Sequence, residues 1–584
     1  MSTRPIIAVV PFGARGTSPR AGAWARQLAR RLVDRFAQES TVDLRPVFLV
    51  AMPRESKDAG YLVFGSSPSA ELAAQYASSA GATHALTATL SDEGPARRIE
   101  VDLVDAATHT AMRLDLRIPA GELQRAEGEI ARWLLKTLGV IATTPADVPA
   151  TANEAAYAAL LEGMDEEVDA TLLRPSDAAR ADASVRTALE RYVDAARADP
   201  TSDLAEVRIL VLAAESLERS DVTRELDALE ALITIRPRSW RAHYILGQLR
   251  AEAGDASGAI VAMEHAHSLQ PLPDADVVRL AELYANAAAP APALAHLRRV
   301  APESSSYGAA QELLAIISFQ RGDEATGGAA YARAVAAGTT SWELHASHGA
   351  ALHSRGALDD AIARYRDALA AGGPAVVRLN LARVLLAEGD RDSALRELDV
   401  VIATDRAGEV FGHAHRLRFG LREPDLEREL ERAGQAALAG EAATLDAART
   451  IFDRAIAIDQ ELWEAHFGRG IVARQRGDAL EAQASFGRVL ELWPDQPDAL
   501  HELGVALLMG NNTNDALAAL DRAAALRSDD PAYVADAGFA HLRAGDLVSA
   551  RARLERAARL DANDPITKSY LGELERAESA GERS

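Results

Sequence analysis

Histidine is the residue type in this sequence best suited to metal binding or acid–base chemistry. His345 and His348 lie three residues apart beside Glu343, so on a helix both rings would share one face. A protein zinc site needs three or four ligands, and no second pair is spaced to complete such a set. We therefore predict that both rings pack inward and that the chain holds no metal. Cysteine is absent, which excludes disulfides, thiolate nucleophiles and Cys-ligated zinc.

A possible anion site follows the apolar run at residues 6–12. The segment PFGARGTSPR places Gly13 and Gly16 before an expected helix, whose amino terminus could hold a phosphate. The segment lacks the GxxxxGKS/T spacing of a phosphate-binding loop and is not GxGxxG, so we predict a plain strand-to-helix turn and no cofactor. No GxSxG elbow and no Ser/His/Asp set in a recognisable local context occurs either. We predict no catalytic residues and a protein that is not an enzyme.

The charge is acidic and unevenly distributed. Residues 1–140 hold 17 Lys and Arg against 15 Asp and Glu, so the formal charge of −23 comes from residues 141–584. This balance argues against binding of nucleic acid along the longer part. The stripe Arg26, Arg30, Arg31 and Arg35 is interpreted as a solvated helix face. No apolar run approaches the roughly 18 residues of a membrane span, and the run at residues 6–11 is too short for a signal-peptide core, so we predict a cytoplasmic protein.

The elements that must position any site repeat every 34 residues. When Trp463, Pro497 and Pro531 are placed at the first position, glycine stands at position eight, as Gly470, Gly504 and Gly538, and alanine at position twenty, as Ala482, Ala516 and Ala550. Small residues at both positions would let two helices cross closely. Gly477, Asn511 and Gly545 at position fifteen tolerate the left-handed conformation that ends a helix. The unit is therefore a helical hairpin, and one such hairpin can bury its apolar face only against its neighbours.

This pattern resembles the tetratricopeptide repeat, a helix-turn-helix unit with a period of 34 residues. The resemblance implies an all-α solenoid, a right-handed superhelix of helical hairpins, over residues 150–582. We expect a first part at 150–404, whose first helix covers 154–167 with a loop near 171–182, and regular units with a closing helix at 441–582. Between them the register slips at 405–440, where segments 410–421 and 425–439 both look helical. An extra helix or a change of pitch is expected there.

The first 145 residues have a different pattern. Apolar or alternating segments predict strands at 6–12, 47–51, 83–90, 98–104 and 110–118, and helices at 21–38, 69–80 and 122–138. Ile99, Val101 and Leu103 alternate with polar residues, which predicts a sheet with one covered face. The segments VVPFG, ELAAQYASSAGATHALTATLSDEG and RRIEVDLVDAATHTAMRLDL, with the later NEAAYAALLEGMD, resemble the TolB-like α/β domain that precedes tetratricopeptide repeats in bacterial regulators. Regulatory use is what this resemblance implies.

In a tetratricopeptide superhelix the first helices line the groove, through positions two, five, nine, twelve and thirteen. From the regular units we predict a partner-binding groove made of Phe467, Ile471, Arg474, Gln475, His501, Val505, Leu508, Met509, Phe539, Leu542 and Arg543. Part of this strip could equally be core between repeats. Lys and Asn, which form the carboxylate clamp of chaperone-binding repeats, are missing at positions five and nine. An apolar or amphipathic partner segment fits better.

We therefore predict a non-catalytic scaffold or adaptor that binds protein segments in the groove, in regulation or assembly. The alternative is a ligand-sensing regulatory protein, in which the amino-terminal domain binds a small molecule or nucleotide and the helical array relays the signal.

Overall fold

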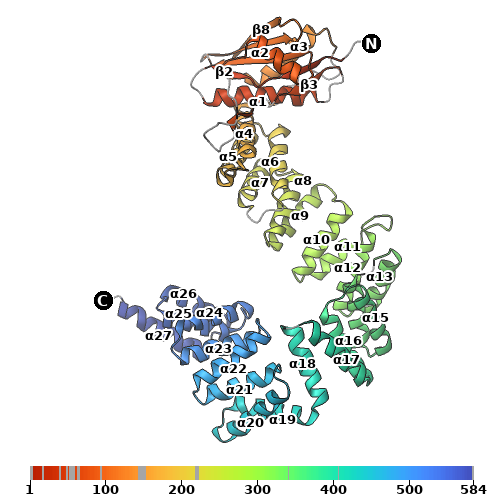
Figure 1. Ribbon diagram of the computed structural model, residues 1–584, viewed down its shortest axis with the longest axis vertical. Helices are drawn as coiled ribbons and strands as arrows, with labels where there is room; N and C mark the ends of the chain where they lie inside the picture. Colours follow the sequence, from red (N-terminus) through yellow and green to blue (C-terminus); the bar gives the residue numbers. More distant parts are fainter. Residues whose placement is uncertain are drawn as a thin grey trace. The chain divides into compact units, whose positions relative to one another are not determined.

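The computed structural model describes residues 4–15, 19–37, 41–47, 50–51, 60–61, 66–92, 95–141, 151, 153–217, 222–339, 341–405 and 407–581. The chain forms two compact units, residues 1–296 and 297–584. An amino-terminal mixed sheet with its helices is followed by a long series of helical hairpins (Figure 1). This is the predicted class, an α/β domain before an all-α solenoid. None of the helices in the described ranges is both long and apolar enough to cross a membrane.

The sheet has the strand order β3-β1-β6-β7-β8, and β2 also pairs with β6. Its strands are β1 (Ile6–Val9), β2 (Gly13–Arg15), β3 (Asp43–Pro46), β6 (His84–Asp92), β7 (Ala96–Asp105) and β8 (Ala111–Pro119). β1 runs parallel to β3 and β6, whereas β6, β7 and β8 form an antiparallel meander. The short strands β4 (Val50–Ala51) and β5 (Gly60–Tyr61) pair separately.

Within the described residues, only the end of the predicted second strand is a strand, because Val50–Ala51 forms β4, which pairs with β5 and not with the main sheet. Residues 47–51 are rich in β-formers, yet the sheet uses Asp43–Pro46 instead. The backbone N–H of Asp43 donates to the carbonyl of Pro5, and that of Val47 to the carbonyl of Val9, each at 2.9 Å. Pairing with β1 therefore decides which residues form this strand, whereas the local preference for β-structure does not. Residues 48 and 49 of the predicted strand lie outside the described residues.

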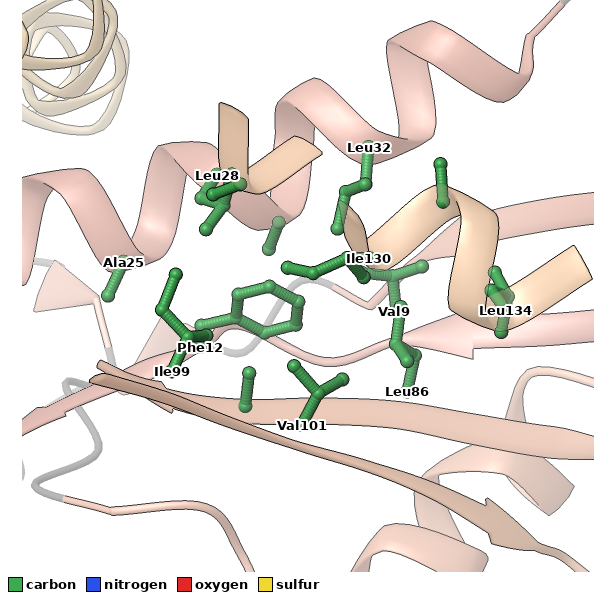
Figure 2. Close-up of a cluster of buried hydrophobic side chains, with 14 of the residues drawn as sticks. Val9, Phe12, Ala25, Leu28, Leu32, Leu86, Ile99, Val101, Ile130 and Leu134 are labelled. Atoms are coloured by element: carbon green, nitrogen blue, oxygen red, sulfur yellow. The ribbon is translucent and has the colours of Figure 1, made fainter. Parts of the chain in front are cut away.

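One face of the sheet is covered by α1 (Pro19–Phe36) and α3 (Ala126–Thr137), which follows the short helix η1 (Leu123–Arg125). Leu28 and Leu32 of α1 and Ile130 of α3 meet Ile99 and Val101 of β7 in a fully buried cluster (Figure 2). The alternation of β7 predicted this covered face. On the other face, α2 (Ala70–Ser79) packs small alanines against the sheet.

The stripe of arginines on α1 is not a solvated face, so that prediction is wrong. α4 (Glu154–Leu173) packs against α1, and Arg26 pairs with Asp165 of this helix. Arg31 and Arg35 pair with Glu127, which is 1% exposed. The guanidinium groups of these three arginines face acids that are distant in sequence, so the sequence pattern alone could not show the pairing; Arg30, the fourth residue of the stripe, is half-buried. The loop expected near 171–182 is also shorter, because α4 ends at Leu173 and α5 begins at Ala178.

The remaining helices of the first unit follow one another along the chain. They are α5 (Ala178–Ala198), α6 (Asp203–Glu215), α7 (Thr223–Ile235), α8 (Trp240–Glu252), α9 (Ala256–Leu269), α10 (Asp274–Asn286) and α11 (Pro290–Leu297), the last of which ends at the boundary.

The second unit continues the series. Its helices are α12 (Tyr307–Gln320), α13 (Glu324–Ala336), α14 (Trp342–Ser354), α15 (Leu358–Ala370), α16 (Ala375–Glu388), α17 (Arg391–Thr404), α18 (Glu409–Arg422), α19 (Pro424–Ala439), α20 (Ala442–Ile458), α21 (Trp463–Gln475), α22 (Ala479–Leu492), α23 (Pro497–Met509), α24 (Thr513–Leu526), α25 (Pro531–Ala544), α26 (Leu547–Leu560) and the closing helix α27 (Pro565–Gly581).

Glycine at position eight makes room for a large side chain at position twenty-four of the same hairpin. A Cβ added to Gly470 would lie 2.6 Å from the ring of Phe486, and one added to Gly538 would lie 2.8 Å from Leu554. The alanines predicted at position twenty, Ala482, Ala516 and Ala550, are all fully buried. The close crossing therefore depends on a third position that the sequence pattern did not single out.

Candidate binding groove

α18 is the extra helix expected where the repeat register slips. It stands between the pair α16–α17 and the pair α19–α20, and belongs to neither hairpin. Its start is fixed against the later repeats: the N–H of Gly408 donates to the carbonyl of Leu492 at 2.7 Å. Gly412 is buried, and a Cβ there would lie 3.0 Å from the indole of Trp463. α18 therefore packs closely beside the beginning of α21.

A polar network holds the middle of α18. His415, with 1% of its side chain exposed, has Nδ1 3.0 Å from Asp459 Oδ2, in the turn before α21. Arg418 Nη2 donates to the same oxygen at 3.0 Å. Burial by itself would raise the pKa of Asp459, but the hydrogen bond and charge of His415, with hydrogen bonds from the backbone of Glu461 and from Arg418, lower it to about 2. Asp459 is therefore ionised at neutral pH, and it ties α18 to the hairpin α21–α22.

A cavity of about 330 Å³ lies between α19 and α21, with Arg416 of α18 at its edge. Its wall on α19 includes Gly434, where an added Cβ would meet no atom within 4 Å, and Leu438, which is 68% exposed. Aromatic and aliphatic side chains make up most of the rest, namely Leu430, Ala437, Phe452, Trp463, Phe467 and Ile471. The cavity is thus an open apolar hollow.

The edge of this cavity is acidic. Arg416 is in contact with Glu427, and lies 3.7 Å from both Glu431 and Glu464. The Oε2 atom of Glu464 is buried and has no hydrogen-bond partner among the described residues. Burial raises the pKa of Glu464 to about 8, and it also raises the pKa of Glu427. One guanidinium therefore serves three carboxyl groups.

Two of the predicted groove residues line this cavity. Phe467 is half-buried, with its ring centroid 6.3 Å from that of Trp463 and 5.5 Å from that of Phe486. Ile471 also lines the cavity but is only 2% exposed, so most of its surface belongs to the core between repeats.

Three other predicted residues contact the first helix of the next repeat. Arg474 Nε lies 2.6 Å from Glu502 Oε2, and His501 Nε2 lies 2.7 Å from Asp536 Oδ2. The ring of Phe539 stacks on Tyr570 at a centroid distance of 4.3 Å. Val505, Leu508 and Leu542 are half-buried, whereas Gln475, Met509 and Arg543 are exposed. None of these nine residues lines the cavity beside α19, and their role in binding stays a prediction.

Several residues of the cavity were missed. Arg416, Glu431 and Gly434 lie where the repeat register slips, so no repeat position could be given to them. Glu464 and Asp498 stand at position two of their repeats, which is one of the five positions expected to line the groove. Reading position two in each regular repeat would therefore have found both acids.

The histidine pair singled out in the sequence packs against aromatic side chains. His345 Nδ1 lies 2.9 Å from the hydroxyl of Tyr331, and His348 stacks on Phe319 at 4.9 Å. Burial lowers the pKa of His348 to about 4, so both rings pack inward as predicted. In the described ranges no group of three or more His, Asp or Glu is placed to hold a metal ion. Gly13 belongs to β2, while residues 16–18 of the possible phosphate loop lie outside the described residues.

Comparison with known proteins identifies the repeats. Residues 352–412 and 467–531 match family models of the tetratricopeptide repeat, which confirms the predicted repeats in these two ranges. The TolB-like resemblance of the amino-terminal domain stays a prediction, because both matches lie in the helical part of the chain. A search among curated proteins finds no match.

Several solved structures are similar to parts of the chain. One is a tetratricopeptide repeat protein from Parabacteroides merdae, with 14% identity, 52% of this chain and 98% of that chain covered, and a TM-score of 0.21. Another is PilF from Pseudomonas aeruginosa, with 16% identity, coverage of 46% and 97%, and a TM-score of 0.23. A third is MamA from Desulfovibrio magneticus RS-1, with 19% identity, coverage of 33% and 97%, and a TM-score of 0.22.

Proposed function

We propose that this protein is a non-catalytic interaction scaffold that docks a segment of a partner protein in the groove between α19 and α21. The observation that carries the proposal is the open cavity beside Trp463 and Phe467, with the exposed side chain of Leu438 at its wall. Tetratricopeptide repeats generally mediate protein–protein interactions. Apolar side chains around a concave surface are the usual features of a peptide-binding groove.

α18 supports the proposal because it gives the groove a fixed edge. His415 and Arg418 hold this helix through the buried carboxylate of Asp459. A site whose walls are already in place loses less conformational entropy on binding than one that must first be ordered. A partner segment would therefore meet a preformed hollow.

We also infer that residues 1–145 form a TolB-like domain that serves regulation or assembly. The order of strand, helix and three-stranded meander supports this inference. Tyr157 of α4 donates a hydrogen bond to Glu127 of the domain at 2.5 Å, and Leu161 belongs to the same core. A change in this domain would therefore reach the first hairpin directly through α4.

Site-specific photo-crosslinking in the full chain tests the scaffold function. A photoreactive residue is placed at Leu438 in the groove or, as controls, at Val548 and Leu480, which are 82% and 79% exposed and lie outside the cavity. We expect the cells that make the protein to yield a partner crosslinked at position 438 and at neither control. The same products at all three positions, or none at 438, would remove the proposal and leave the ligand-sensing alternative.

A further inference from the structure

The charges around the cavity indicate which partner the groove would accept. The charged residues in its lining are Arg416, Glu431, Glu464 and Asp498. Asp498 is already satisfied by neighbours, because Gln496 Nε2 donates to it at 3.0 Å and the hydroxyl of Tyr533 donates to its other oxygen. In the described part of the chain, the carboxyl groups of Glu431 and Glu464 have no comparable pair of side-chain donors. Both lie 3.7 Å from the guanidinium of Arg416.

These two glutamates lie at different depths. The side chain of Glu431 is 61% exposed, and that of Glu464 is 23% exposed with Oε2 buried and unpaired among the described residues. A cation that enters over the apolar wall would therefore meet one carboxyl group at the opening and a second one deeper inside. An arginine or lysine side chain has the apolar stem and charged end that such a path requires.

The apolar part of the cavity is large enough for an anchoring side chain. An engineered cavity of about 150 Å³ in another protein holds benzene, and this one measures about 330 Å³. Gly434 leaves its wall without a side chain at this point. One aromatic or aliphatic side chain would be covered by Phe467 and Trp463.

We propose that the groove between α19 and α21 recognises a basic amphipathic polypeptide segment. An apolar side chain of that segment fills the cavity, and an arginine or lysine within one helical turn pairs with Glu431 and Glu464. This inference rests on the proposed scaffold function and adds the chemistry of the partner. An acidic segment or a free carboxyl terminus is disfavoured, because it would meet the carboxyl groups of Glu431 and Glu464 against one arginine.

Proton release should accompany binding. The charged groups around Glu464 are Arg416 from α18, Glu427 and Glu431 from α19, Asp459 from the turn before α21, and Asp498 from α23, which lines the same cavity. Burial raises the pKa of Glu464 to about 8, so its carboxyl group is mostly protonated at neutral pH. A bound cation favours the ionised form, so affinity for a basic segment should rise as the pH increases toward 8. A peptide whose basic residue is replaced by glutamine should lose this dependence.

The test is a selection of random short peptides displayed on phage against the full-length protein. The same selection is run against Gly434→Leu, whose side chain would fill the hollow, and Gly487→Leu, a matched control in α22 where an added Cβ also meets no atom within 4 Å. We expect clones that bind the wild type and Gly487→Leu, fail to bind Gly434→Leu, and are enriched in Arg or Lys beside an apolar residue.

Two outcomes separate this inference from the scaffold function. Groove-dependent clones that are acidic or uncharged would overturn the basic partner and leave the scaffold function standing. No clone sensitive to Gly434→Leu would overturn both. For a selected basic peptide, we expect the double variant Glu431→Gln, Glu464→Gln to weaken binding about tenfold. Unchanged affinity in that variant would also overturn the inference.

Discussion

The hairpin crossing can be tested by filling the space at position eight. In Gly470→Ala the new Cβ would lie 2.6 Å from the ring of Phe486, roughly 0.8 Å inside the shortest ordinary contact of 3.4 Å. Both residues are buried, so the ring must shift. Overpacking of this kind costs about 1–3 kcal/mol, whereas replacing glycine by alanine inside a helix gains about 1 kcal/mol. We expect a net loss of about 0–2 kcal/mol.

Gly487→Ala in α22 is the matched control, because a Cβ there meets no atom within 4 Å. It should gain about 1 kcal/mol from helix propensity alone. The assay is amide hydrogen exchange of peptides from α21 and α22 in the full chain, which reports local opening free energies. In a Phe486→Ala background, Gly470→Ala should become as favourable as the control. If Gly470→Ala stabilises the intact hairpin as much as Gly487→Ala does, the proposed nesting of positions eight and twenty-four is wrong.

Three further predictions concern titratable side chains. Because the folded state raises the pKa of Glu464 to about 8, the free energy of unfolding should fall as the pH rises from about 4.5 to 8. In urea unfolding, Glu464→Gln should therefore raise the free energy of unfolding by about 2–4 kcal/mol above pH 8 but by little below pH 4.5. An equal effect of the substitution at both pH values would refute this. Burial opposes protonation of His501, yet Asp536 raises its pKa. The stabilisation of the folded state by the pair of His501 and Asp536 is therefore complete below about pH 6.5 and is lost as the pH rises through the folded pKa of His501. His501→Gln should therefore cost about 1 kcal/mol more in acid than in alkali, and a larger loss in alkali would contradict the pairing. The depressed pKa of Asp459 stabilises α18 above about pH 4, and this contribution is lost as the pH falls toward 2. Asp459→Asn should cost about 1–3 kcal/mol at neutral pH, seen as faster amide exchange in α18, and unchanged exchange there would exclude the anchoring role.

The sequence predicted the repeats because their geometry is local. Gly477 and Gly545 adopt positive φ angles of 79° and 83° at the ends of first helices, as their position in the 34-residue pattern required. Gly470 and Gly538 likewise mark the crossing. The second strand was misplaced because pairing with β1, which is distant in sequence, selects Asp43–Pro46.

The groove was predicted only in part, for two physical reasons. Arg416 and Glu431 come together through the packing of α18 and α19, which do not follow the repeat register. Arg474 and His501 were also predicted to line the groove, and they pair with Glu502 and Asp536 of the following repeats, so their role in binding a partner stays a prediction. Both acids stand at position six, which the predicted groove positions leave out.

The central claim is that a basic amphipathic segment docks between α19 and α21. A crystal structure of the full-length protein with a selected basic peptide tests this claim most directly. The account predicts an apolar side chain beside Gly434, Trp463 and Phe467, with a guanidinium or ammonium group in contact with Glu431 and Glu464. A peptide bound on another surface, or one bound here with its basic group turned away from both glutamates, would contradict it.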